Sequence, residues 1–430
     1  GKYHARPSLQ QRHTLLHQHQ QTETQSPKVN GQSSILLLAY TNRAVDEICN
    51  MLSEHELDYI RIGNEYCCDP KYSDHLLQEV LDENTTLNSI KSTLSEAQII
   101  VATTSTMNSR SALFNIKHFD LVIIDEASQI LEPNIVGILT ARQEEGRAID
   151  RFILVGDHKQ LPAVVQQQGE ADVEETSSVL ENIHLSSCSN SLFERLILTE
   201  RAAGRTDFIG TLHKQGRMHP DIAAFPNTYF YEREQLECVP LAHQTELNLP
   251  YNEPSEDKTD DFLKAHRMVF IPSQSCRKPY ISEKVNTEEA RIVADLVRRL
   301  YRQMDTTFDA QKSIGIIVPY RNQIAMIRKE LEQLRLPAID KISIDTVERY
   351  QGSQRDVMIY SFTVQHRYQL DFLTANCFEE GGRIIDRKLN VALTRARLQM
   401  ICIGCEEVLK EDVLFKKLIA HSASITPEER

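Results

Sequence analysis

The stretch "ILLLAYTNRAVDEI", residues 35–48, decides the fold. Five apolar residues, Ile35–Ala39, precede a polar turn at Tyr40–Asn42, and a helical pattern begins near Ala44. In α/β proteins, the junction between a buried strand and the next helix is where phosphates and nucleic acids are bound. The stretch therefore predicts a parallel α/β sheet with a ligand site at the ends of its strands.

Length and charge narrow the class of protein. A chain of 430 residues has room for about two or three domains. The net charge of −13 argues against coating nucleic acid by bulk charge, although a narrow groove lined by backbone amides and hydroxyls remains compatible with it. No apolar run approaches the roughly 20 residues of a membrane span, so we expect no membrane partner. Nine scattered cysteines suit a reducing compartment, and we expect a cytoplasmic protein.

Short apolar runs alternate with helical patterns along most of the chain. Near-continuous apolar strands separated by helices predict parallel sheets that are covered on both faces. Nine such strands exceed what one compact unit of this size holds, so we predict two α/β domains. The predicted strands are Ile35–Ala39, Gln98–Thr103, Leu121–Asp125, Phe152–Gly156, Met268–Ile271, Ile314–Pro319, Ile342–Thr346, Val357–Phe362 and Met400–Gly404.

The predicted domain boundaries follow from shifts in composition. Residues 1–33 are rich in Gln and His and show no apolar period, which predicts an unpacked segment. The first domain is expected over residues 34–200, the second over 205–420, and a tail over 421–430. Two polar, turn-rich stretches, Gln166–Asn190 and Thr245–Asp261, are predicted to be insertions or loops.

The segment "FDLVIIDEASQI", residues 119–130, carries the strongest local signal. An apolar strand ends there in two adjacent carboxylates, Asp125 and Glu126. This pattern is typical of the second half of a nucleotide-hydrolysis site, in which Asp125 holds a magnesium ion through its water shell and Glu126 orients and deprotonates the attacking water. The alternative is a pair of acidic residues at a strand end without a ligand.

Two further segments offer groups that suit a phosphate. In "GDHKQLP", residues 156–162, Gly156 permits close backbone approach and Gln160 is suited to sensing a γ-phosphate or a nearby water. In "NVALTRAR", residues 390–397, Arg395 provides a guanidinium that stays charged and binds phosphate through two donors. The alternative for the second segment is an ordinary pair of surface arginines.

Two segments of the predicted second domain place polar residues near strand ends. In "VPYRNQI", residues 318–324, Tyr320 and Arg321 offer an aromatic plane and a cation. In "DTVERYQGSQRD", residues 345–356, Thr346 and Gly352 lie in a strand–loop–strand segment. Ligands bind at the carboxyl ends of strands in open α/β sheets. The alternative for Tyr320 is a rim or core residue.

The order of these segments resembles the superfamily 1 helicases. The resemblance is strongest to the branch that contains the nonsense-mediated decay helicase, senataxin and the immunoglobulin mu-binding helicase, and it extends from about Ser34 to Gly404. A single segment is weak, whereas eight in order are specific. They are "AYTNRAVDEI", "VATTSTM", "DEASQ", "GDHKQLP", "QGRMHP", "VPYRNQI", "DTVERYQGSQRD" and "NVALTRAR".

This resemblance implies a fold of two RecA-like P-loop NTPase domains with parallel sheets and a nucleotide cleft between them. It implies a helicase or translocase that hydrolyses ATP with Mg²⁺ and moves along single-stranded DNA or RNA. By position, Asp125 and Glu126 match the magnesium and water-activating pair, and Gln160 matches the γ-phosphate sensor. Arg395 matches the arginine finger, and Tyr320 matches the residue that stacks on adenine.

The resemblance also implies the nucleic-acid contacts. Hydroxyl and backbone contacts position a strand without reading its sequence, which is how an acidic protein binds a polyanion. The matching residues are Thr41, Asn42, Thr103, Thr104 and Thr346.

Two positions depart from the family pattern. Arg321 directly follows the tyrosine, whereas some relatives place their arginine where this chain has Ile324. Gln354 stands where several relatives have a ribose-binding Glu. Arg321, Gly156 and Gly352 are retained as predicted nucleotide-binding positions.

The largest departure concerns the phosphate loop. A GxxxxGK[ST] loop should precede the Ile35 strand by one helix, because its amides and lysine hold the phosphates. The chain has no such match, but it begins Gly1-Lys2 with Tyr3 where Ser or Thr is expected. Our hypothesis is that Gly1-Lys2 is the tail of that loop, with Lys2 contacting phosphate, and that a reading-frame slip replaced residues 3–30. The alternative is an ordinary disordered N-terminal tail.

Three other functions stay open at this point. One is a truncated or ATPase-inactive nucleic-acid-binding protein. Another is an ATP-driven remodeller of nucleoprotein complexes that does not unwind duplexes. The third is a helicase region that belongs to a longer nuclease fusion, although the chain shows no nuclease carboxylate cluster.

Overall fold

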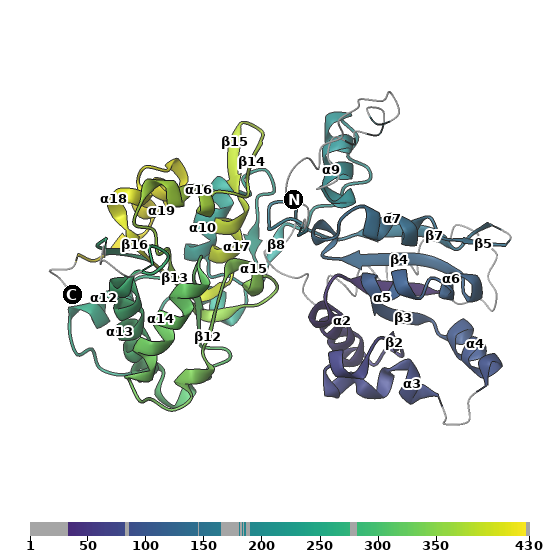
Figure 1. The fold of residues 1–430 in the computed structure, drawn as a ribbon, viewed down its shortest axis with the longest axis horizontal. Coiled ribbons are helices and arrows are strands. Elements are labelled where there is room, and N and C mark those ends of the chain that lie inside the picture. Colours follow the sequence, from purple (N-terminus) through teal and green to yellow (C-terminus); the bar gives the residue numbers. More distant parts are fainter. Residues whose placement is uncertain are drawn as a thin grey trace. The chain divides into compact units, whose positions relative to one another are not determined.

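The computed structural model describes residues 33–81, 86–144, 146–164, 180, 183, 185, 190–275 and 282–426. These residues form two compact units (Figure 1), one built from residues up to 158 together with 162–211, and the other from 159–161 together with 212–426. The predicted N-terminal segment and Lys2 lie outside the described residues, as does almost all of the predicted insertion Gln166–Asn190.

The first unit is built on a five-stranded parallel sheet (Figure 1). The strand order is β2-β3-β1-β4-β7, with β2 added to the four strands that the sequence predicts for this domain. Its strands are β1 (Ile35–Ala39), β2 (Ile60–Ile62), β3 (Ile99–Thr103), β4 (Phe119–Asp125) and β7 (Ile149–Leu154). A two-stranded ladder is formed by β5 (Arg142–Gln143) and β6 (Gly146–Arg147).

Both faces of the first sheet are buried. Successive side chains of a strand point to opposite faces, and in β1 Leu36 and Leu38 enter one core while Ile35, Leu37 and Ala39 enter the other. The covering helices are α2 (Asn42–Glu54), α3 (Leu77–Val80), α4 (Leu87–Glu96), α5 (Thr104–Ser109), α6 (Leu113–Ile116), α7 (Pro133–Leu139) and α9 (Leu192–Ala202).

The second unit contains a six-stranded parallel sheet in the order β12-β11-β13-β16-β10-β17. All five strands predicted for this domain are present. They are β10 (Met268–Ser273), β11 (Ile314–Ile317), β12 (Ser343–Asp345), β13 (Arg355–Ser361) and β16 (Ala396–Cys405), and the edge strand β17 (Ala423–Ser424) joins them. Two small ladders pair β8 (Lys214–Gln215) with β9 (Glu237–Cys238) and β14 (Cys377–Glu380) with β15 (Arg383–Asp386).

The second sheet is also covered on both faces. In β10, Met268 and Phe270 enter one core, and Val269 and Ile271 enter the other. The helices of this unit are α10 (Pro220–Tyr229), α11 (Ala242–Thr245), α12 (Lys258–Ala265), α13 (Thr287–Met304), α14 (Arg321–Glu332), α15 (Val347–Tyr350), α16 (Leu370–Leu373), α17 (Arg387–Leu393), α18 (Glu406–Leu409) and α19 (Val413–His421). Within the described ranges, none of the helices is long and apolar enough to span a bilayer.

The stretch Thr245–Asp261, predicted to be an insertion or loop, is a loop between α11 and the start of α12, but it is not peripheral. Leu249 and Tyr251 are buried in a core of the second unit, and the Tyr251 hydroxyl donates to Gln399 Oε1 of β16 at 2.5 Å. The polar composition of the stretch has a different cause, because its acidic residues meet arginines of α13.

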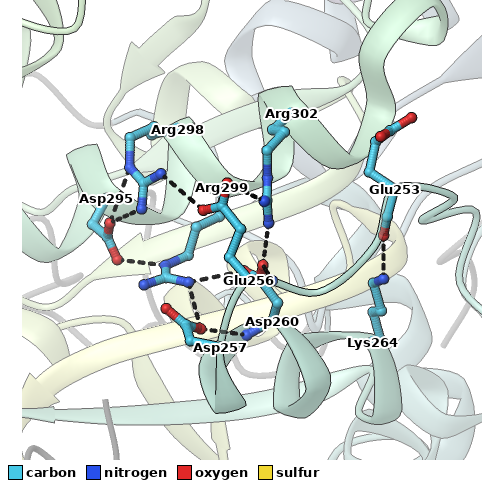
Figure 2. A network of polar contacts seen from close by, with 9 residues as sticks. All are labelled: Glu253, Glu256, Asp257, Asp260, Lys264, Asp295, Arg298, Arg299 and Arg302. Carbon is cyan, nitrogen blue, oxygen red and sulfur yellow. Dashed lines mark hydrogen bonds and ion pairs between the residues drawn. The ribbon is translucent and has the colours of Figure 1, made fainter.

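Those acidic residues form the ion-pair network of Figure 2. Arg299 Nη1 lies 2.7 Å from Asp257 Oδ1 and 2.8 Å from Asp260 Oδ1, and Arg302 also contacts Asp260. Burial alone would raise the pKa of Asp260, but the Glu256 backbone N–H and the arginines lower it. The network therefore fastens the start of α12 to the surface of α13.

Replacing Arg299 tests this role. Arg299→Met is expected to lower the free energy of unfolding by about 3 kcal/mol, because the buried Asp260 carboxylate loses one of its cations. Its pair with Arg302 remains. Arg291→Met, at an exposed arginine of the same helix outside the network, is the matched control and is expected to change it by less than about 0.5 kcal/mol. Urea unfolding at pH 7 measures both, and equal losses in the two variants would contradict the assignment.

Candidate functional site

The carboxyl ends of the strands in the first sheet gather the predicted polar residues at one edge. Ala39 at the end of β1 is in register with Thr103 of β3 and with Asp125 of β4. Because all these strands are parallel, the turns that follow them leave the sheet on the same side. The sheet thus brings together the predicted hydroxyl and carboxylate residues of the first domain.

The turn after β4 fixes the Glu126 carboxylate. Glu126 adopts a left-handed backbone conformation with φ of 54°, which for a residue other than glycine costs about 1–3 kcal/mol. Its N–H donates to Asp125 Oδ1 at 3.0 Å, and Gln129 Nε2 donates to Glu126 Oε2 at 2.8 Å. Backbone strain at a paired carboxylate is the kind of feature that clusters at functional sites. Sequence reasoning missed the orienting role of Gln129, although the residue belongs to "DEASQ".

Gly156 packs the turn after β7 against the turn after β4. A Cβ atom added at Gly156 would lie 2.9 Å from the backbone N of Ser128. The Ser128 hydroxyl also accepts a hydrogen bond from the Asp157 N–H at 3.2 Å. Close packing of these two turns accounts for the glycine, whether or not a nucleotide contacts it.

The four threonine and asparagine positions predicted for the first domain differ in exposure. Thr41 caps α2 by accepting from the Ala44 N–H at 3.2 Å, and both Thr41 and Asn42 are exposed. Thr103 caps α5 in the same manner, whereas Thr103 and Thr104 are buried. The structure therefore leaves the first pair open to a ligand more than the second pair.

Arg395 lies at the amino edge of the second sheet, between α17 and β16. Its carbonyl accepts from the Arg355 N–H at the start of β13, and its side chain is 1% exposed. Its Nε donates to Val391 O at 3.0 Å and its Nη2 to Gln160 Oε1 at 3.3 Å. Gln160 and Arg395, which the resemblance assigns to the same γ-phosphate, are thus in contact within the second unit.

A second arginine, Arg217 of "QGRMHP", joins this cluster and was not singled out from the sequence. Its Nε donates to Gln354 Oε1 at 2.9 Å and its Nη1 to Thr394 O at 3.1 Å. Gln354, the residue that replaces the family's ribose-binding Glu, therefore has a partner within the protein. Its place in the family segment "QGRMHP" was the signal available in the sequence.

Lys159 fastens the segment that carries Gln160 to the second unit. Its Nζ lies 2.8 Å from Glu234 Oε2, 2.9 Å from Glu380 Oε2 and 2.8 Å from Phe230 O. Its carbonyl accepts from Asn390 Nδ2 of α17 at 2.7 Å. The ammonium thus meets an acceptor for each of its three protons, and the β14–β15 hairpin supplies one of them through Glu380.

Asp386 caps α17, the helix that leads to Arg395. Its Oδ1 accepts from the Leu389 N–H at 2.9 Å, and the side chain is fully buried. Burial raises the pKa of Asp386 to about 7, and the nearby Asp412 adds to this, while the backbone N–H groups of Leu389 and Lys388 oppose it. The cap therefore holds its proton well above the pH at which an exposed aspartate ionises.

A buried polar network lies at the opposite, carboxyl edge of the second sheet. Glu289 of α13 accepts from the Ser361 hydroxyl at 2.6 Å, the Thr363 N–H at 2.8 Å and the Ser273 hydroxyl at 3.1 Å. Burial raises the pKa of Glu289 to about 7, although these donors lower it.

The same network sets the start of α14. Gln323 Oε1 accepts from the Asn286 N–H and its Nε2 donates to the Asn286 carbonyl, both at 2.9 Å. Gln323 thereby fastens the first turn of α14, which follows Tyr320 and begins with the exposed Arg321. The glutamine of "VPYRNQI" is a structural residue.

The structure does not bring Tyr320 together with Arg395. Tyr320 follows β11 at the carboxyl edge, as Thr346 follows β12, whereas Arg395 lies at the amino edge. The seven residues of β13 separate the two edges by about 20 Å. Gly352, with φ of 80°, lies in the connection that returns from Thr346 to the start of β13.

The carboxylates of the first domain can supply part of the ligand set of a magnesium ion. Mg²⁺ takes oxygen ligands and is commonly held by one or two carboxylates together with water and substrate phosphates. Asp125 supplies such a carboxylate, and across the described ranges no three His, Cys, Asp or Glu side chains gather as a metal site. The residues present suit an ion that arrives with a nucleotide.

An AAA domain family profile matches residues 188–407 and a second AAA domain profile matches residues 75–168. The "DNA replication ATP-dependent helicase/nuclease DNA2" of Xenopus laevis is 31% identical over 406 residues, which cover 90% of this chain and 34% of that protein. An ATP-dependent helicase of Methanocaldococcus jannaschii, named as uncharacterized, is 29% identical over 341 residues, covering 78% of this chain and 43% of that protein.

The chain spans well under half the length of either relative. Among solved structures, Arterivirus nonstructural protein 10, a helicase, in complex with DNA aligns with 88% of this chain and 57% of that chain. The identity is 13% and the TM-score is 0.38.

Two parallel α/β sheets, each covered on both faces, together with the two AAA domain matches define a protein of two RecA-like domains. The chain belongs to the superfamily 1 helicases, in the branch that contains the DNA2-type proteins. The resemblance seen in the order of the sequence segments is therefore confirmed.

The cap of α17 gives a prediction about pH. In the unfolded chain Asp386 ionises near pH 4, whereas in the folded protein it ionises near 7, so the folded state binds the extra proton between these values. Its contribution to the free energy of unfolding therefore falls as the pH rises from about 4 to 7, by up to about 4 kcal/mol, and stays level above that.

Asp386→Asn keeps an oxygen acceptor for the Leu389 N–H and removes the ionisation. We expect urea unfolding of this variant to show a smaller loss of stability between pH 5 and pH 8 than the unaltered chain shows. An unchanged slope would contradict a protonated cap. Asp386→Ala isolates the contribution of the capping hydrogen bond. Because it removes the acceptor, it should lower the free energy of unfolding by about 1 kcal/mol at pH 5 as well.

The Lys159 cluster gives a second prediction. Lys159→Met should lower the free energy of unfolding by about 3–5 kcal/mol, because the carboxylates of Glu234 and Glu380 then lose a buried cation that pairs with both. Lys312→Met, at an exposed lysine of the same unit, is the matched control and should change it by less than about 0.5 kcal/mol. A loss in Lys159→Met as small as that of the control would show that the cluster does not hold this segment.

Proposed function

We propose that this chain is the motor region of an ATP-dependent nucleic-acid helicase or translocase. It would hydrolyse ATP to move along single-stranded DNA or RNA. The observation that carries the proposal is the Asp125–Glu126 pair at the carboxyl edge of the first sheet, with Glu126 held in a left-handed turn by Gln129. Family membership supports the same reaction.

In the proposed mechanism each residue has a specific task. Bound Mg²⁺ would neutralise the phosphates and be held through Asp125. Glu126, aimed by Gln129, takes a proton from the attacking water. Gln160 and Arg395 contact the γ-phosphate, and their mutual contact in the second unit presents them as one group.

Nucleic acid is proposed to contact the carboxyl edge of the sheet in each unit. Thr41 and Asn42 are exposed there in the first unit and Thr346 follows β12 in the second. Thr103 and Thr104 belong to the same edge through their backbone. Contacts of this kind go to phosphate and sugar, so we propose binding without sequence preference to single-stranded DNA or RNA.

A second candidate follows from the missing GxxxxGK[ST] match. It is a nucleic-acid-binding protein that does not hydrolyse ATP, since the phosphate loop supplies the amides and the lysine that hold the phosphates. Remodelling of nucleoprotein complexes without unwinding would instead keep the ATPase.

For either function we propose a reducing, cytoplasmic setting, which is supported by the free thiols of the described cysteines.

ATP turnover with and without single-stranded DNA or RNA tests the proposal. Stimulated turnover should fall by about 100-fold or more in Glu126→Gln, because the amide cannot accept the proton from water. Glu144→Gln, at an exposed glutamate of the same unit, should leave it unchanged. Absent turnover with retained binding of single strands would favour the second candidate, and turnover without duplex unwinding would favour remodelling.

A further inference from the structure

The β14–β15 hairpin (Figure 1) lies outside the eight sequence segments that carry the family resemblance, yet it contacts the elements that hold two of them. At one end, Glu380 Oε2 of β14 lies 2.9 Å from the Nζ of Lys159, the residue before Gln160. At the other end, Asp386 of β15 caps α17, the helix that leads to Arg395. One hairpin therefore joins the segment of the predicted γ-phosphate sensor to the helix of the predicted arginine finger.

Lys159 is held through its main chain as well as through its side chain. Its buried ammonium lies between Glu380 and Glu234, and Asn390 Nδ2 of α17 donates to its carbonyl at 2.7 Å. That carbonyl belongs to the planar peptide that joins Lys159 to Gln160. Fixing both ends of Lys159 therefore fixes the peptide from which the Gln160 side chain departs.

Contacts within α17 connect the same asparagine to Arg395. The Thr394 hydroxyl donates to Asn390 O at 2.8 Å, and Arg395 Nη2 donates to Thr394 Oγ1 at 3.0 Å and to Gln160 Oε1 at 3.3 Å. The side chains of all four residues are buried. A lost contact among them is costly because the buried partner is left without an acceptor or donor. The network thus places Gln160 and Arg395 relative to each other.

The hairpin is itself fastened to the second unit near Glu380. Arg383 of β15 is the register partner of Glu380, donates to Thr228 O at 2.8 Å and also contacts Glu232. The Glu380 side chain is 12% exposed, whereas the preceding Glu379 is exposed on the other face of the strand. Of the two neighbouring glutamates, Glu380 is the one that packs into the protein.

We propose that the β14–β15 hairpin positions the γ-phosphate contacts for ATP hydrolysis, and that Glu380 is a positioning residue that acts through Lys159 on Gln160. Glu380 holds the ammonium of the residue whose carbonyl carbon is bonded to the nitrogen of Gln160. Groups that meet charge developing in the transition state lose their effect when they are displaced by about 1 Å, with a larger loss in rate than in substrate binding. The inference rests on the proposed ATP hydrolysis and adds a structural element to it.

Steady-state ATP turnover by the full chain, with saturating oligothymidylate, separates rate from binding. Glu380→Ala is expected to lower kcat by about 10- to 100-fold and to leave the KM for ATP within about twofold of its original value. Glu380→Gln keeps an oxygen that accepts from the Lys159 ammonium, so its loss should be smaller. Glu379→Ala, at the exposed glutamate of the same strand, is the matched control and should leave both constants unchanged.

A double-mutant cycle tests whether Glu380 acts through Lys159. In a chain that already carries Lys159→Met, the further change Glu380→Ala should lower kcat no more, because the residue that connects Glu380 to Gln160 is gone. Urea unfolding curves establish that each variant is folded under the assay conditions. Independent, multiplying losses in the double variant would show that Glu380 does not act through Lys159.

Hydrogen exchange of the nucleotide-free chain gives a measurement that does not depend on turnover. Glu380→Ala should speed amide exchange in peptides that cover residues 158–162 and α17, because these segments lose a shared attachment. Peptides from β10, β13 and β16 should exchange as in the unaltered chain. Glu379→Ala should change neither group of peptides.

The other outcomes contradict the inference in distinct ways. An unchanged kcat in Glu380→Ala, or a raised KM alone, would show that the hairpin does not position Gln160 and would leave ATP hydrolysis standing. Faster exchange throughout the second sheet would assign Glu380 to stability alone. Absence of turnover by the unaltered chain with single strands would refute the proposed hydrolysis, and hydrogen exchange would then decide whether the hairpin fixes the segment of Gln160.

Discussion

Burial of both faces of each parallel sheet is the constraint on which the rest of this structure depends. The side chains of β1 and of Met268–Ile271 in β10 alternate between two apolar cores, so none of them is left for a ligand. Their backbone groups are used in the ladders. Polar chemistry is therefore confined to the turns at the sheet edges, where parallel connections bring distant parts of the sequence together.

Buried polar groups then fix those turns. Lys159 is held by two carboxylates and a carbonyl, Glu289 by three hydroxyl and amide donors, and Asp386 by the first turn of α17. A buried charge or polar group is costly unless its partners are in place, so each cluster favours one arrangement of its loop. The loops that carry Gln160, Tyr320 and Arg395 are each next to such a cluster.

How far the sequence predicts the structure depends on the range of the interaction. Nine apolar runs gave nine strands, whereas β2 and β17, with three and two residues, were missed because so short a run has no period to recognise. The stretch Thr245–Asp261 is a loop, as predicted, but the sequence did not show that its acidic residues pair with α13, which lies far along the chain. Likewise Gln323 belongs to a recognisable segment, and its partner Asn286 does not.

The sequence by itself determined the class of fold, the family and the chemical type of the residues at the strand ends, because apolar period and segment order are local properties of the chain. Only the tertiary structure decided which of those residues meet. It joined Gln160 to Arg395, supplied Arg217 as a partner for Gln354, and placed Tyr320 at the opposite sheet edge beneath Phe372. Such contacts arise from strand register and loop packing between segments that are remote in sequence, and no local pattern records them.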